Sequence, residues 1–108
     1  MKTLKFKDNL VPLVLSGEKY STMRLFDDKN LQAGDELTLI NKDSGEEFSK
    51  ATIISVREKK LGDFTEQDYE GHEKFENDEH MYATYRSYYG DRVTPDTLAK
   101  IVVFKLNI

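Results

Sequence analysis

Side chains that can do chemistry are concentrated near the N-terminus, in the stretch GEKYSTMR at residues 17–24. If this stretch is extended, Thr22 and Arg24 point to one side, and Lys19 arrives from the turn just before them. A threonine hydroxyl attacks a carbonyl only when a base takes its proton. A lysine amine can be that base when burial or a neighbouring cation such as Arg24 lowers its pKa. With one glutamate to carry the proton to a leaving nitrogen, these groups are sufficient to hydrolyse an amide.

The same three residues also have an ordinary interpretation. Lys19 can be a solvated lysine that offsets the negative end of a preceding helix, and Thr22 can be a simple strand residue. Arg24 can form a surface ion pair with Asp27 or Asp28. The two interpretations differ in a testable way, because only the first requires Lys19 and Thr22 to face a common cleft.

The elements that would position these groups follow from hydrophobic periodicity and from turn residues. The predicted strands are 4–8, 22–26, 36–41, 48–58 and 99–108. The predicted helices are a short one that contains Pro12 and stops at Gly17, one or two turns ended by Gly71, and one from Asn77 to Gly90. The strands at 36–41 and 48–58 should form an antiparallel hairpin, because the DSGE sequence between them accepts the dihedral angles of a tight turn.

The order of these elements indicates an α/β fold of the α+β type. Strands follow one another instead of alternating with helices, so a doubly wound parallel sheet is not expected. A strand near each end of a short chain favours a small mixed β-barrel, closed or nearly closed, with short helices covering its ends.

Length and composition limit the class of protein. A chain of 108 residues has room for one core, so one domain should cover 1–108. Hydrophobic residues make up 38% of the chain, and no apolar run approaches the ~20 residues that cross a bilayer. The first residues lack the pattern of a secretory signal. Cysteine is absent, which excludes disulfides and thiolate chemistry and favours a cytoplasmic location.

The net charge of −4 is unevenly distributed. Residues 1–60 contain 11 Lys and Arg against 10 Asp and Glu, whereas residues 61–108 contain 5 against 10. A chain without a basic run lacks the counterion release that drives tight binding of a long polyanion, so DNA is not expected as a partner. A local patch around Lys19 and Arg24 could still hold one nucleotide or anion.

The order of several motifs resembles the ASCH domain family, whose fold is a PUA-like β-barrel. The motifs are Gly-x-Lys-x-x-Thr-x-Arg at 17–24, AGDELTL at 33–39, FTEQDYEG at 64–71 and the strand VVFKL at 102–106. The resemblance extends over nearly the whole chain. It implies an RNA-binding module or, as in a small bacterial branch, an enzyme that hydrolyses the acetyl amide of N4-acetylcytidine with a Lys, a Thr and a Glu.

Carried onto this sequence, the resemblance implies that Lys19, Thr22 and one glutamate are catalytic. The Glu-Gly pair places the glutamate at Glu70, and a small gap in that loop would place it at Glu73. A charged segment, HEKFENDE at 72–79, is longer here than in the small amidohydrolases, so the resemblance is stronger for the fold than for the reaction. The residues expected to contact a ligand are Gly17, Tyr20, Ser21 and Arg24.

Three functions are therefore compatible with the sequence: hydrolysis of an acylated nucleoside, non-catalytic binding of a nucleotide or a short RNA feature, and protein interaction. No cofactor and no membrane partner are expected, and the oligomeric state is not predicted. His72, Glu76 and His80 have helical spacing, but Gly71 and Asn77 interrupt such a helix, so we expect no metal site. The tyrosines of the last helix are expected to lie in the core and at its rim. They are Tyr82, Tyr85, Tyr88 and Tyr89.

Overall fold

Five strands and two α-helices make up the computed structural model, which describes residues 1–107. The strands are β1 (Lys2–Phe6), β2 (Ser21–Leu25), β3 (Glu36–Asn41), β4 (Glu47–Lys60) and β5 (Leu98–Leu106). The helices are α1 (Val11–Ser16) and α2 (Asp78–Tyr89), with 3-10 turns η1 (Asp8–Leu10), η2 (Leu61–Asp63) and η3 (Glu66–Tyr69). Within the described residues, no helix has the length and apolar character needed to cross a bilayer.

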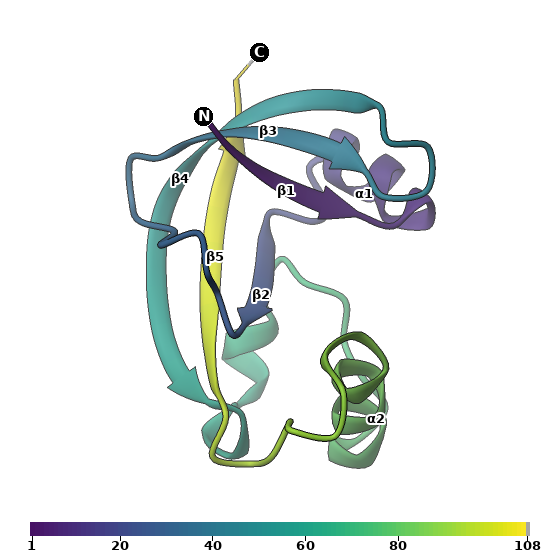
Figure 1. The fold of residues 1–108 in the computed structure, drawn as a ribbon, viewed down its shortest axis with the longest axis vertical. Coiled ribbons are helices and arrows are strands. Elements are labelled where there is room, and N and C mark those ends of the chain that lie inside the picture. Colours follow the sequence, from purple (N-terminus) through teal and green to yellow (C-terminus); the bar gives the residue numbers. More distant parts are fainter. Residues whose placement is uncertain (108) are drawn as a thin grey trace.

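The strands form one curled sheet in the order β1-β3-β4-β5-β2. β1 runs parallel to β3, and the other neighbouring strands are antiparallel. Figure 1 shows that the long strands β4 and β5 bend, which brings the edge strands β1 and β2 to the same side of the molecule. The expected α+β barrel-like fold is confirmed. In the described part of the chain the sheet is a half-barrel, because no ladder joins β1 to β2.

The predicted hairpin is present. β3 has the expected bounds, and it pairs antiparallel with β4, which extends beyond the predicted strand to Lys60. Gly45 closes the turn with φ of +76° and donates its N–H to the Asn41 carbonyl over 2.8 Å. A register shift between Ile53 and Ser55 bends β4, so that it keeps pairing with β5 along its whole second half.

The bounds of four strands differ from the prediction, since β1, β2 and β5 differ as well as β4. β1 ends at Phe6 instead of residue 8, because Asp8 begins η1. β2 ends at Leu25, and Phe26 leaves the strand with a positive φ of 52°. β5 begins at Leu98 and ends at Leu106, and the last residue of the predicted strand 99–108 lies outside the described residues.

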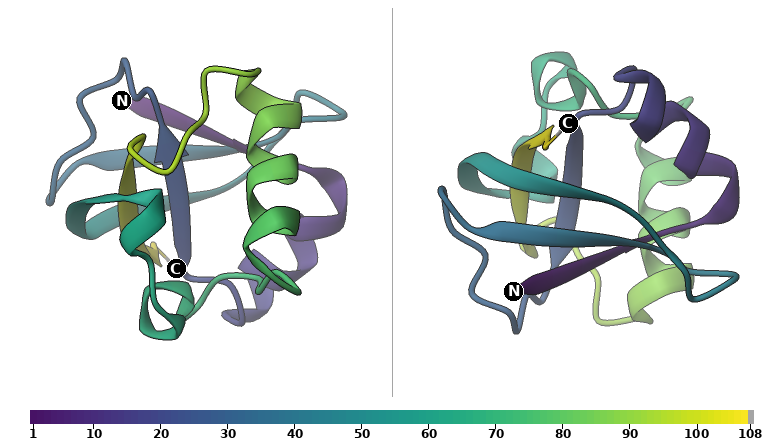
Figure 2. Two further views of the ribbon diagram at one scale, coloured as in Figure 1. Left: turned by 90° about the horizontal axis from the view of Figure 1, so that it is seen from below. Right: turned by 90° about the horizontal axis from the view of Figure 1, so that it is seen from above.

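Buried side chains form two clusters, one on each side of the curled sheet. The first joins β1, β3 and β4 to α1 and includes Phe6, Val14 and Leu39. The second lies under α2, where Met81 and Tyr85 pack against β2 and β5. In both views of Figure 2, α2 runs along one side of the sheet, next to β2. The second cluster fixes α2 against β2 and β5, and residues of α2 and of the edge strands line the site described below.

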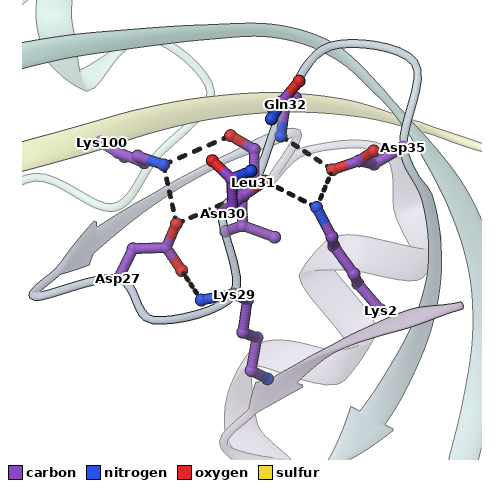
Figure 3. A network of polar contacts seen from close by, with 8 residues as sticks. All are labelled: Lys2, Asp27, Lys29, Asn30, Leu31, Gln32, Asp35 and Lys100. Atoms are coloured by element: carbon purple, nitrogen blue, oxygen red, sulfur yellow. Dashed lines mark hydrogen bonds and ion pairs between the residues drawn. The ribbon is translucent and has the colours of Figure 1, made fainter.

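The loop between β2 and β3 is held by a polar network (Figure 3). Asp27 accepts hydrogen bonds from Lys100 Nζ at 2.8 Å and from the Leu31 backbone at 3.0 Å. Lys2 Nζ binds Asp35 at 2.6 Å and the carbonyl of Asn30. Asp27 is therefore paired with β5, and in the described residues Arg24 forms no ion pair with Asp27 or Asp28, the two partners that the sequence allowed.

Candidate functional site

Lys19 is the central residue of the site, because its long cationic side chain is buried. The residue is 4% exposed. Its Nζ donates to the backbone carbonyl of Ser21 at 2.9 Å and to Glu73 Oε2 at 2.7 Å. A buried lysine is rare unless its charge is compensated. The interpretation of Lys19 as a solvated lysine is therefore wrong.

Local structure before β2 brings Lys19 to this position. Gly17 follows the last residue of α1 with φ of +86°, a left-handed conformation that glycine adopts without strain. The chain then turns back, and the Lys19 N–H donates to the Leu13 carbonyl over 3.0 Å. Gly17 is exposed and does not line the cleft, so its contribution is to the direction of the chain.

Thr22 and Arg24 lie on the same side of β2, as the two-residue period of a strand predicts. Arg24 Nε donates to Thr22 Oγ1 at 3.1 Å, so the threonine oxygen accepts from a cation and its own proton remains available. Arg24 Nη2 donates to the Lys5 carbonyl at 3.1 Å, and its guanidinium lies 5.1 Å from the centre of the Phe6 ring. Arg24 thus connects the edge strands β2 and β1 across the opening of the half-barrel.

The loop after η3 supplies the acidic group, and it is fixed to β2 by backbone hydrogen bonds. The Gly71 carbonyl accepts from the N–H groups of Tyr20 at 2.9 Å and Ser21 at 3.1 Å. The Ser21 hydroxyl, which is buried, donates to the Glu70 carbonyl at 2.9 Å. These bonds set the direction in which the next residues, including Glu73, leave the loop.

Asp68 anchors the start of this loop to β4. It is 4% exposed and accepts hydrogen bonds from Lys59 Nζ at 2.8 Å, Arg57 Nη2 at 3.2 Å and the Thr65 backbone at 2.8 Å. Burial raises the pKa of Asp68, but these donors lower it more, to about 2. The loop therefore rests on a buried carboxylate that remains ionised at neutral pH.

Of the two candidate glutamates, the structure places Glu73 against Lys19 and leaves Glu70 outside the cleft. The Glu70 side chain is exposed, and its Oε1 accepts from the Tyr20 hydroxyl at 3.4 Å. The Glu73 side chain is 38% exposed and lines the cleft. Glu73 is thus the one of the two that lines the cleft, and a catalytic role for either glutamate stays a prediction.

His72 also faces the cleft, and sequence reasoning considered it only as a metal ligand. Its side chain is 6% exposed, and Nδ1 lies 2.6 Å from the Glu73 carbonyl. Since a carbonyl only accepts, Nδ1 carries the proton and Nε2 is left as an acceptor. Burial and the charge of Lys19 lower the pKa of His72 to about 4, so it is neutral at pH 7.

The protonation of Lys19 is set by opposing effects. Burial lowers the pKa of Lys19, the charge and the hydrogen bond of Glu73 raise it, and Arg24 lowers it again, with a net decrease. For Glu73, partial burial raises the pKa, but His72 and Lys19 lower it more. Lys19 and Glu73 thus form a close ion pair over one short hydrogen bond.

A cleft of about 440 Å³ unites these groups and lies between the sheet edge and α2. This volume is within the ~300–1,000 Å³ that small-molecule sites occupy. Phe6, Tyr85, Tyr88 and Tyr89 are among its aromatic lining residues, and Lys19, Thr22, Arg24 and Glu73 are among its polar ones. Tyr85 is buried and donates to Met23 Sδ at 3.2 Å, and Tyr88 is 45% exposed. Aromatic rings beside polar and charged groups suit a planar heterocycle that carries polar substituents.

Other residues expected at the site have other positions. Tyr20 is 38% exposed and covers Gly71, and Ser21 is buried beneath the loop, so neither lines the cleft. His72 and Glu76 precede α2, which begins at Asp78, so the helical spacing with His80 does not occur on one helix. Among residues 1–107, no three His, Asp or Glu side chains are grouped as a metal site.

Comparison with known proteins relates this architecture to solved structures. By sequence, neither a family model nor a curated protein matches the chain. The ASCH domain from Lactobacillus crispatus JV V101 matches with a TM-score of 0.73 at 17% identity, over 97% of this chain and 79% of that one. Protein EF3133 from Enterococcus faecalis V583, described under the family model DUF984, has a TM-score of 0.74 at 16% identity, over 91% and 69%.

A ZmASCH mutant protein from Zymomonas mobilis also matches, with a TM-score of 0.63 at 14% identity, over 95% of this chain and 66% of that one. TM-scores at this level establish a common fold, whereas at identities of 14–17% the activity has to be argued from the site. The resemblance seen in the sequence motifs is borne out at the level of the fold: this chain has an ASCH-domain fold.

Proposed function

We propose that the protein hydrolyses the acyl amide of an N4-acylated cytidine or a closely related acylated nucleoside. One observation carries this proposal: the buried amine of Lys19 binds Glu73 over 2.7 Å in the cleft that also holds Thr22 and Arg24. A Lys, a Thr and a Glu are the set that the motif resemblance implies for this reaction. Here Lys19 comes from the turn before β2, Thr22 from β2 and Glu73 from the loop before α2, and all three line one cleft.

In the proposed reaction, Thr22 Oγ1 attacks the acyl carbon while its proton passes to Lys19. A neutral Lys19 uses two N–H groups for the Ser21 carbonyl and Glu73, which leaves its lone pair to take that proton. The C–N bond then breaks, and the Lys19–Glu73 pair returns a proton to the departing nitrogen. Water hydrolyses the acyl ester of Thr22, which releases the carboxylic acid and restores the hydroxyl. Arg24 favours the threonine alkoxide through its hydrogen bond.

A second candidate is binding of a nucleotide or a short RNA feature without turnover. It is favoured by the basic lining of the cleft, which needs no chemical step to attract an anionic ligand. The third possibility from sequence, a protein-interaction module, has no specific feature of the site in its favour.

The test is incubation of the purified protein with N4-acetylcytidine, with cytidine and acetate separated by chromatography. We expect the wild type to release cytidine and acetate at equal rates. The variant Thr22→Val should release neither. If N4-acetylcytidine and a panel of other acylated nucleosides remain intact, the hydrolase proposal fails and the binding function replaces it.

A further inference from the structure

The cleft is basic although the chain as a whole is acidic. The net charge of the chain is −4. The cleft lining contains one carboxylate, that of Glu73. The lining also contains six cationic side chains: Lys5, Lys7, Lys19, Arg24, Lys42 and Lys74. Lys19 and Arg24 have roles in the proposed reaction, whereas the other lysines have none, so their concentration here requires a separate explanation.

Two of these lysines share one aromatic ring. Lys7 Nζ lies 4.7 Å from the centre of the Tyr88 ring, and Lys42 Nζ lies 5.6 Å from the same centre. The ring lies on the last turns of α2 and is 45% exposed. In the described part of the chain, neither ammonium group forms an ion pair with a carboxylate. Two positive charges therefore lie within 5.6 Å of one ring centre, and both lysines are exposed.

The sheet topology explains why both lysines reach the same ring. β1 and β3 are parallel with Phe6 opposite Asn41, so the residues that follow each strand leave the sheet at the same edge. The Lys42 N–H donates to the Phe6 carbonyl at 2.7 Å, which extends the pairing by one position. Asp8 and Asp43 lie in the same corner. Their oxygens accept from the Asn41 side-chain amide and from the Asp8 N–H, respectively.

Like charges brought together this way repel each other, and an anion between them removes the repulsion. We propose that Lys7, Lys42 and Tyr88 form a phosphate-binding clamp at the mouth of the cleft. The ligand of this site is then a cytidine nucleotide, with its base in the cleft and its phosphate between the two ammonium groups. This inference rests on the proposed function in one respect, since it takes the cleft as the nucleobase site.

The experiment compares the affinity of the protein for cytidine, cytidine 5′-monophosphate and cytidine 3′-monophosphate by calorimetry at low salt. At least one monophosphate should bind 10-fold or more tightly than cytidine, and added salt should reduce this preference. The variant Lys7→Gln/Lys42→Gln should lower the preference to less than 2-fold while its affinity for cytidine stays the same. The matched control is Lys50→Gln/Lys105→Gln, which removes the same charge from two exposed lysines outside the cleft and should keep the preference.

Preference for one monophosphate over the other supports the clamp and identifies the position of the phosphate. Equal binding of all three ligands, no binding of either monophosphate, or a preference that survives Lys7→Gln/Lys42→Gln overturns it. These measurements need no turnover, so they separate the two proposals. If the monophosphate preference depends on Lys7 and Lys42 but no acylated nucleoside is hydrolysed, the clamp is supported and the hydrolase proposal is rejected. If the nucleoside is hydrolysed but no monophosphate is preferred, the hydrolase proposal is supported and the clamp is rejected.

Discussion

The amine nitrogen of Lys19 lies 2.7 Å from Oε2 of Glu73, a residue 54 positions further along the chain. The lysine side chain is 3% exposed, whereas the glutamate side chain is 38% exposed. The pair therefore reaches from the protein interior to the exposed side of the cleft. This arrangement gives a buried amine a route for exchanging protons, and it makes the roles of the two glutamates in the loop separable by experiment.

Glu73→Gln should lower kcat for an acylated cytidine by at least ~10²-fold, the usual scale for loss of a positioned acid–base group. Glu70→Gln is the matched control, since it makes the same change three residues away on an exposed side chain. It should retain turnover within about 2-fold of the wild type. Steady-state kinetics by chromatography measure both variants. A loss confined to Glu70→Gln would indicate that Glu70 is the catalytic glutamate. Equal losses in the two variants would contradict a role specific to Glu73.

Arg24→Gln should move the pH dependence of turnover. Burial is the main cause of the lowered pKa of Lys19, and the charge of Arg24 lowers it further. Without that charge the pKa of Lys19 rises, so the acidic limb of kcat/KM should shift to higher pH. The rate at the optimum should also fall, because Thr22 loses the hydrogen bond from Nε. A lower rate with an unmoved limb would show that Lys19 is not the titrating base.

His72 should make folding stability depend on pH between about 6.5 and 4. Its pKa is lowered from 6.5 to about 4 in the folded state, so the unfolded chain takes up a proton first as the pH falls. The stabilisation is complete above pH 6.5 and decreases by about 3 kcal/mol by pH 4. Urea unfolding across this range should show the decrease in the wild type and not in His72→Gln. The control His80→Gln, which changes an exposed histidine of α2, should behave as the wild type does.

Asp68 should stabilise the fold at neutral pH and lose this effect in acid. Its pKa is lowered from 3.8 to about 2, so the stabilisation is present above pH 3.8 and decreases as the pH approaches 2. Asp68→Asn should lower the free energy of unfolding by about 2 kcal/mol at pH 7. The difference from the wild type should shrink near pH 2. Asp63→Asn, at an exposed position of η2, should have little effect at either pH.

A side chain at Gly71 should lower the free energy of unfolding for two reasons that experiment can separate. Its φ is +74°, and a Cβ there would lie 2.5 Å from Tyr20 Cε1. Gly45 has nearly the same φ, +76°, with no atom within 4 Å of its Cβ position. Gly45→Ala should therefore report the backbone effect alone, about 1 kcal/mol, and Gly71→Ala should lose more.

In the double variant Gly71→Ala/Tyr20→Ala, compared with Tyr20→Ala, the effect of the alanine should fall to the size seen for Gly45→Ala. Chemical denaturation of the single and double variants measures this coupling. If Gly71→Ala is no worse than Gly45→Ala, the ring of Tyr20 moves aside freely and the loop is not held as the structure indicates.

Local patterns determined a large part of the fold. The turn residues of DSGE and the alternation on either side predicted the β3–β4 hairpin, and Asn77 and Gly90 correctly marked the ends of α2. The two-residue period of β2 placed Thr22 and Arg24 together, and the left-handed conformation expected after a short helix occurs at Gly17. These features depend on backbone conformation within a few residues, which the sequence encodes directly.

Only the tertiary structure decided which groups meet. The choice of Glu73 over Glu70 follows from hydrogen bonds between the Gly71 carbonyl and the start of β2, some 50 residues away in sequence. The burial of Lys19 and the approach of Lys7 and Lys42 to the Tyr88 ring likewise come from the closing of the sheet and the parallel pairing of β1 with β3. In a chain that is 33% charged, residue types alone leave many pairings open. Solvation and distance select among them, and both are set by long-range packing.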